Sequence, residues 1–146
     1  MIEAGMELAP PDWPKAGDVT GTQNFGPFAR EALARYAAIS GDDNPLHLEP
    51  NAARTAGLAQ PPVHGMLMLS CFEQLLMRWR RDLFIARLSG KFLRPVLAGE
   101  GIRVSGRVMR RREVPRPELI LRLTARAQNN DLAIVGEATV LYKIPG

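Results

Sequence analysis

The hydrophobic pattern of this chain changes its period once, and that change restricts the possible folds more than any other feature. From His64 to Leu83 the apolar residues recur at helical spacing, and the first half of this segment, up to Phe72, is apolar all round. A helix of that kind is wrapped by protein on every side. After it, apolar and polar residues alternate, which is typical of strands. The pattern therefore predicts one buried helix followed by a sheet.

Four segments of the C-terminal half follow the strand period. Strands that follow one another without intervening helices pair as an antiparallel meander. We therefore predict an α+β fold in which an antiparallel sheet wraps around the long central helix. The four strands are expected at residues 87–96, 102–108, 119–124 and 132–142, and a turn signal, Asn129-Asn130-Asp131, precedes the last one.

The N-terminal half is predicted to hold shorter elements, and a length of 146 residues corresponds to a single domain over residues 1–146. Proline and glycine supply most of the boundaries. In chain order we expect an irregular lead-in over residues 1–17, a weak strand over 18–25, a helix that starts near Pro27 and stops at Gly41, a polar loop over 42–50 and a short helix over 51–56.

Composition excludes several classes of protein. One cysteine and two histidines are too few for a disulfide framework or for a metal cluster, so no metal is expected. The longest apolar run, residues 66–72, is far shorter than the roughly 20 residues of a membrane span. The start of the chain is acidic and lacks the pattern of a signal peptide. We therefore expect a cytoplasmic protein with no membrane partner.

Charge is divided unevenly along the chain. Residues 1–73 carry 4 basic and 9 acidic side chains, whereas residues 74–146 carry 15 and 6. A basic half favours an anionic partner. However, the basic residues are scattered over predicted strands, and no nucleic-acid motif is present. We expect no nucleic-acid partner: a solvated outer face of the sheet is favoured, and contacts of a few arginines with a phosphorylated cofactor come second.

The polar loop holds the first candidate for chemistry. In Ser40-Gly41-Asp42-Asp43-Asn44-Pro45-Leu46-His47 a carboxylate and an imidazole lie five residues apart across a turn set by Asn44-Pro45. Placed side by side, Asp42 and His47 would form a general acid/base pair. The alternative, which spacing alone favours, is an Asx turn that caps the preceding helix and leaves His47 at the surface.

The second candidate is the start of the central helix, Pro61-Pro62-Val63-His64-Gly65-Met66-Leu67. A free amide at Gly65 would point outward with the helix dipole behind it, and would suit the oxyanion of a thioester carbonyl. The alternative is that Gly65 only permits close packing. We expect His64 to be a hydrogen-bonded structural residue and Cys71 to be a buried, inert thiol.

These motifs together resemble a known family. The stretch from Ser40 to His47 resembles the hydratase signature of MaoC-like dehydratases and (R)-specific enoyl-CoA hydratases, and His64-Gly65-Met66-Leu67 is similar to their second motif. Phe92-Leu93-Arg94-Pro95-Val96 and Gly99-Glu100 resemble the strand and turn after their central helix. The resemblance covers roughly residues 28–142, and it implies a hot-dog fold and a homodimer or higher oligomer with its acyl tunnel near the interface.

The resemblance also implies a reaction, the reversible hydration of a trans-2-enoyl thioester to an (R)-3-hydroxyacyl thioester. The substrate would be an acyl-CoA, with acyl carrier protein as a possible alternative handle, and no metal or redox cofactor would be needed. Asp42 and His47 would be catalytic, the Gly65 amide would bind the carbonyl, and Asn44 would help to shape the catalytic loop.

Lys91 and Arg94 are candidates for contacts with coenzyme A. Several hydratases carry a small polar residue about two turns into the central helix, where this chain has Glu73, a carboxylate that either alters the tunnel or faces solvent. The alternatives to an enoyl-CoA hydratase are a 3-hydroxyacyl-carrier-protein dehydratase and a non-catalytic acyl-thioester-binding domain. Thioesterases share the hot-dog fold but lack the Asp-to-His signature.

Overall fold

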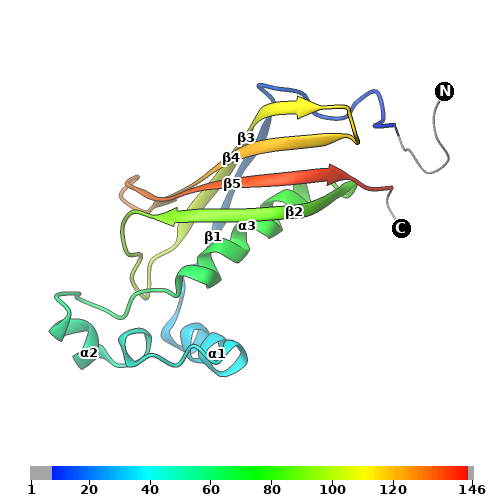
Figure 1. Ribbon diagram of the computed structural model, residues 1–146. Coiled ribbons are helices and arrows are strands. Elements are labelled where there is room, and N and C mark those ends of the chain that lie inside the picture. Colours follow the sequence, from blue (N-terminus) through cyan, green and yellow to red (C-terminus); the bar gives the residue numbers. More distant parts are fainter. Residues whose placement is uncertain (1–7, 145–146) are drawn as a thin grey trace.

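A curved, five-stranded antiparallel sheet surrounds one long helix in the computed structural model, which describes residues 8–144 (Figure 1). The predicted α+β class, with an antiparallel sheet around a central helix, is confirmed. In chain order the elements are β1 (Val19–Phe25), α1 (Arg30–Ser40), the 3-10 helix η1 (Pro45–His47), α2 (Pro50–Thr55), α3 (Gly65–Trp79), β2 (Leu83–Phe92), β3 (Ile102–Arg112), β4 (Glu118–Ala127) and β5 (Leu132–Tyr142).

The strand order is β1-β3-β4-β5-β2, so the predicted meander holds for β3, β4 and β5 but is wrong for β2, which pairs with β5. The cause lies in the connection between β2 and β3. Val63 donates to the carbonyl of Val96 at 2.7 Å, and Ala98 donates to that of Pro61 at 2.8 Å. These bonds lead residues 93–101 past the start of α3, and the chain re-enters the sheet beyond β4. Strands β1 and β2 are therefore the two edges.

Helix α3 is shorter than the predicted span from His64 to Leu83. It ends at Trp79, and Leu83 is the first residue of β2, which therefore lies over 83–92 instead of 87–96. Arg80 takes an extended backbone, and its guanidinium donates to both carboxylate oxygens of buried Asp82 at 2.8 Å. This pair turns the chain out of the helix.

No helix within residues 8–144 is long and apolar enough to cross a membrane.

The first turns of α3 are less enclosed than predicted. Met66 is 61% exposed, although Met68, Leu69 and Phe72 are buried in the core. The exposed positions of α3 recur at helical spacing, so α3 keeps one open stripe in the single chain. The expectation that protein wraps this segment on every side is therefore wrong for that stripe.

Helix α1 begins at Arg30, three residues later than the predicted start at Pro27. The Phe28 amide donates to the Glu100 carbonyl at 2.9 Å, and the Phe28 carbonyl accepts from Gly99 at 2.7 Å. Because both backbone groups of Phe28 are engaged with another segment, the chain stays extended there.

The other short elements lie close to their predicted places. Gly41 ends α1 in the left-handed conformation, with φ of 81°, and its amide donates to Ala37 at 2.9 Å. Helix α2 begins one residue before the predicted 51–56. Within the predicted lead-in, residues 8–17 contain turns, and Trp13 is buried against the edge of Tyr142. Residues 1–7 of that lead-in lie outside the described part.

Arginines line the outer face of the sheet, as the charge pattern predicts. Arg103 and Arg107 of β3 alternate with buried residues and face Arg126 and Arg122 of β4 across the strand pair. Alternate residues of a strand point to opposite faces, so these side chains point away from α3. The expected solvated outer face is therefore present.

A row of glycines allows α3 to lie close to the sheet. Gly90 of β2 pairs with Gly136 of β5, and the row continues across β4 to Gly106 of β3. A Cβ atom on Gly90 would lie 2.9 Å from Leu69, and one on Gly136 would lie 3.2 Å from the ring of Phe72. The missing side chains therefore make the room into which two apolar residues of α3 pack.

We expect Gly136→Ala to lower the free energy of unfolding by about 1–3 kcal/mol. The new methyl group would be crowded from two sides, because it would lie 3.0 Å from the Ser89 carbonyl oxygen and 3.2 Å from the Phe72 ring. The matched control is Glu137→Ala, at the exposed neighbouring position, which should change it by less than about 0.5 kcal/mol. Urea denaturation at fixed protein concentration measures both, and equal stability of the two variants would contradict this packing.

Candidate functional site

The loop between α1 and α2 is held by its own polar groups. The Asn44 side chain accepts from the Leu46 amide at 3.0 Å, and the His47 amide donates to the Asn44 carbonyl at 3.0 Å. The Asp42 amide donates to the Ser40 hydroxyl at 3.1 Å. Asn44 thus caps η1, which follows it, instead of the preceding helix. This local network presents the Asp42 and His47 side chains.

The His47 ring is anchored through one nitrogen. Its Nδ1 lies 2.7 Å from the backbone carbonyl oxygen of Pro62. A carbonyl can only accept, so Nδ1 carries the hydrogen, and in the neutral ring Nε2 keeps its lone pair. His47 is half-buried, not a free surface residue. The anchored ring therefore leaves a basic nitrogen available for proton transfer.

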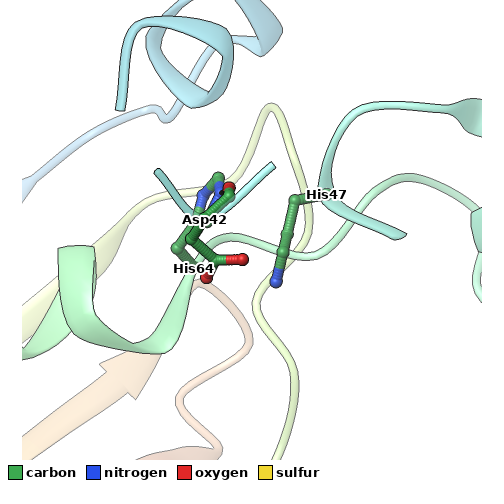
Figure 2. A group of neighbouring side chains, drawn as sticks. All are labelled: Asp42, His47 and His64. Carbon is green, nitrogen blue, oxygen red and sulfur yellow. Dashed lines mark hydrogen bonds between the residues drawn. The ribbon is translucent and has the colours of Figure 1, made fainter. Parts of the chain in front are cut away.

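Asp42 lies beside this ring, so the structure brings the two predicted acid/base residues together. One carboxylate oxygen of Asp42 and one ring nitrogen each of His47 and His64 all lie within 4.8 Å of one another (Figure 2). Asp42 is exposed. A separation of this order leaves room for one water molecule that hydrogen-bonds to a carboxylate and an imidazole together.

The N-terminus of α3 lies at the same place. Gly65 is its first residue, and the N-cap residue, His64, forms no side-chain capping bond. The first amides of a helix have no partner within the helix, and the dipole favours negative charge there. A Cβ atom on Gly65 would lie 2.9 Å from the ring of Phe92. The close approach that was one reading of Gly65 is therefore present, and the role of its amide in binding a carbonyl stays a prediction.

His64 is hydrogen-bonded and buried, as expected of a structural residue, but its contacts with Asp42 and His47 were not predicted. Its Nε2 donates to the Asp42 backbone carbonyl at 3.1 Å. Its ring stacks on that of His47 with centroids 4.0 Å apart, and it makes an edge-to-face contact with the Tyr36 ring, whose centroid lies 4.7 Å away. Burial lowers the pKa of His64 below its usual value, although the bond to the Asp42 carbonyl opposes that shift. The sequence feature that could have indicated this contact is that the chain has only two histidines, one in each of the two motifs.

The cluster of Asp42, His47 and His64 offers three ligand types that metals accept. The two imidazole planes, however, lie only 21° apart in a stack. The lone pairs of imidazole nitrogens lie in the ring plane, so those of two stacked rings cannot converge on one cation at the usual distance of about 2 Å. We therefore assign no metal to this cluster.

Three further residues lie apart from the cluster. Arg94 forms an ion pair with Asp131 at 2.9 Å, and exposed Lys91 pairs with Val135 along the β2–β5 ladder. Among the hydrogen bonds and ion pairs of residues 8–144, none joins Lys91 or Arg94 to Asp42 or His47. The role of Lys91 and Arg94 in binding coenzyme A stays a prediction. Glu73 is exposed on α3, so in the single chain it faces solvent.

The chain is similar to known hydratases and dehydratases. Residues 12–126 match the model of the MaoC-like domain. The chain is 36% identical to an (R)-specific enoyl-CoA hydratase of Aeromonas caviae over 81% of this chain and 87% of that protein. It is 33% identical to a mitochondrial 3-hydroxyacyl-[acyl-carrier-protein] dehydratase of Arabidopsis thaliana over 87% of this chain and 76% of that one.

The fold agrees with these similarities. The solved structure of the (R)-hydratase of A. caviae involved in PHA biosynthesis superposes with a TM-score of 0.81 and 32% identity, over 92% of this chain and 99% of that chain. The fold is the hot-dog fold that the resemblance implies. The chain belongs to the MaoC-like domain family. Its cytoplasmic location stays a prediction.

We expect the Cys71 thiol to resist modification in the native protein. Burial raises its pKa to about 11, so at pH 8 only about one molecule in a thousand carries the reactive thiolate. The reaction with Ellman's reagent should be slow in buffer and fast in urea, and it reports on Cys71 alone because the chain has one cysteine. Rapid reaction of the folded protein would contradict the inert assignment.

Proposed function

We propose that this protein catalyses the reversible hydration of trans-2-enoyl thioesters to (R)-3-hydroxyacyl thioesters, with acyl-CoA as substrate. The observation that carries the proposal is that the acid/base pair, Asp42 and His47, lies at the uncapped N-terminus of α3. The similarity to an (R)-specific enoyl-CoA hydratase over most of both chains supports the same reaction and stereochemistry.

The chemistry follows from the positions of these groups. A water between Asp42 and His47 would supply a hydroxyl group to C3 and a proton to C2, and the unprotonated Nε2 of His47 can accept a hydrogen from that water. As the C2–C3 double bond is attacked, its electrons move toward the thioester oxygen. The Gly65 amide would stabilise that oxygen, and loss of such a donor costs about 3 kcal/mol.

Crotonyl-CoA tests the proposed reaction directly. A hydratase consumes the conjugated double bond without release of free thiol, and chiral analysis should find the (R)-3-hydroxy product. Thiol release without hydration would indicate a thioesterase. Binding of crotonyl-CoA with neither signal would indicate a non-catalytic acyl-thioester-binding domain. Either of the last two results would refute the proposal.

A second candidate differs in the handle that carries the acyl group. The similarity to a 3-hydroxyacyl-[acyl-carrier-protein] dehydratase and the basic C-terminal half favour an acidic carrier protein. Exposed charge contacts are screened beyond about 8 Å at physiological salt. A strong preference for crotonyl-carrier protein over crotonyl-CoA at low salt, lost at high salt, would establish the carrier-linked substrate.

Asp42→Asn and His47→Gln should each lower turnover by roughly 10²- to 10⁴-fold, because each removes a group that moves a proton. The melting temperature should change little, since neither side chain belongs to the buried core. Asp43→Asn is the matched control, because Asp43 is exposed in the same loop, and it should keep wild-type turnover. Wild-type turnover of either test variant would remove that residue from the mechanism.

We also propose that the protein is a homodimer joined along the β2 edge. Beyond the bonds with β5, the other edge of β2 has no strand partner among residues 8–144, and such edges favour pairing. Phe84 and Phe92 of β2 are about half exposed, at 52% and 47%, and Met77 of α3 is exposed beside Phe84 in one surface hollow. A second copy would cover this apolar surface.

Sedimentation should therefore give at least twice the chain mass of 16.1 kDa. Phe84→Glu, which places a charge in the proposed interface, should shift the protein toward the monomer, whereas Arg107→Glu on the outer face should not. A fully active wild-type monomer would contradict both the dimer and a tunnel at its interface.

A further inference from the structure

His64 contacts both proposed catalytic residues from inside the protein. It donates to the Asp42 backbone, stacks on the His47 ring and directly precedes Gly65 in the chain. Figure 2 shows the three side chains gathered where the loop meets α3. The two histidines of the chain therefore lie face to face, one half-buried and one with 0% exposure.

The two rings differ in which nitrogen carries the hydrogen. His47 is bonded through Nδ1, which leaves Nε2 open. His64 is bonded through Nε2 to the carbonyl of Asp42, so its hydrogen is on Nε2. Its Nδ1 is buried and has no hydrogen-bond partner among the described residues. His64 thus offers no hydrogen to a substrate, and the hydrogen bond that its side chain forms holds the loop.

The surroundings of the His64 ring lower its pKa and so favour its neutral form. Burial is the largest cause and a proton on neighbouring His47 acts in the same direction, while the bond to the Asp42 carbonyl and the Asp42 carboxylate oppose them. Tyr36, from α1, also packs against the His64 ring. A neutral ring leaves His47, on which it stacks, free of a repelling charge when His47 takes a proton.

We propose that His64 is a positioning residue that ties the catalytic loop to the start of α3, and so sets Asp42, His47 and the Gly65 amide in one geometry. The inference deepens the proposed hydratase function and rests on it. His64 occupies the N-cap position, where a side chain often accepts from the first helical amides. Its ring is bonded to the loop instead, so those amides stay available for a thioester oxygen.

Two substitutions separate the hydrogen bond from the ring. His64→Phe keeps a stacked ring but leaves the Asp42 carbonyl without its donor, and kcat should fall roughly 10- to 100-fold. KM should change less than about threefold, because the variant keeps the binding groups. His64→Gln can still donate from its amide, and its kcat should fall less. Equal kcat values for His64→Phe and the wild type would refute the proposal.

Double variants test whether His64 acts through Asp42. In an Asp42→Asn background, His64→Phe should lower kcat by a smaller factor than it does alone, because the part of its effect that acts through the Asp42 carboxylate is already lost. In the control Asp43→Asn background it should keep its full effect. A full multiplicative loss in the Asp42→Asn background would show that His64 acts independently of Asp42, and would overturn the proposal.

Nitrogen NMR of the imidazoles provides a readout that needs no turnover. In the wild type, His64 should be predominantly neutral at pH 6.5 with its hydrogen on Nε2, and the His47→Gln variant assigns the signals because only one histidine remains. A hydrogen on Nδ1 of His64 would overturn the proposal, whether or not His64→Phe folds. A neutral Nε2–H ring in a protein without hydratase activity would refute the reaction and not the tie between His64 and Asp42.

Discussion

Helix α3 packs against a part of the sheet from which side chains are missing, at Gly90 and Gly136. Leu69 and Phe72 fill that space, so the contact fixes both the height of α3 above the strands and its position along its own axis. The first residue of α3 is Gly65, and its amide therefore has a set position relative to the sheet. The packing of Phe72 against the sheet thus helps to determine where a substrate oxygen could be bound at Gly65, seven residues earlier in the chain.

Backbone carbonyls, not other side chains, accept the hydrogen bonds of the two histidines of the site. Pro62 supplies the acceptor for His47, and Asp42 supplies the acceptor for His64. An extended segment rich in proline has no internal hydrogen bonds, so its carbonyls are open to neighbouring elements. The carboxylate of Asp42 and Nε2 of His47 are consequently not needed for structure. Such an arrangement separates the groups that hold the site from those that could react.

Local patterns predicted more of this protein than long-range ones did. The span of β5 matched its period of two. Asp42 and His47 were recognised because the stretch from Ser40 to His47 resembles a family signature, whereas their spacing alone favoured a surface turn. The end of α3 was missed because an ion pair, Arg80 with Asp82, overrides a helical pattern that continues to Leu83. The partner of β2 and the contacts of His64 depend on segments distant in the sequence, which periodicity does not report.

The position of β5 has a consequence for how the chain folds as it is made. Residues 132–142 form an interior strand, with β4 on one side and β2 on the other. Strand β2 therefore has no partner in this sheet until about fifty further residues have left the ribosome, and α3 lacks the part of the sheet that Gly136 provides. At about 5–20 residues per second, apolar α3 waits several seconds without its full cover. Nascent chains of this protein should accordingly be substrates for holding chaperones.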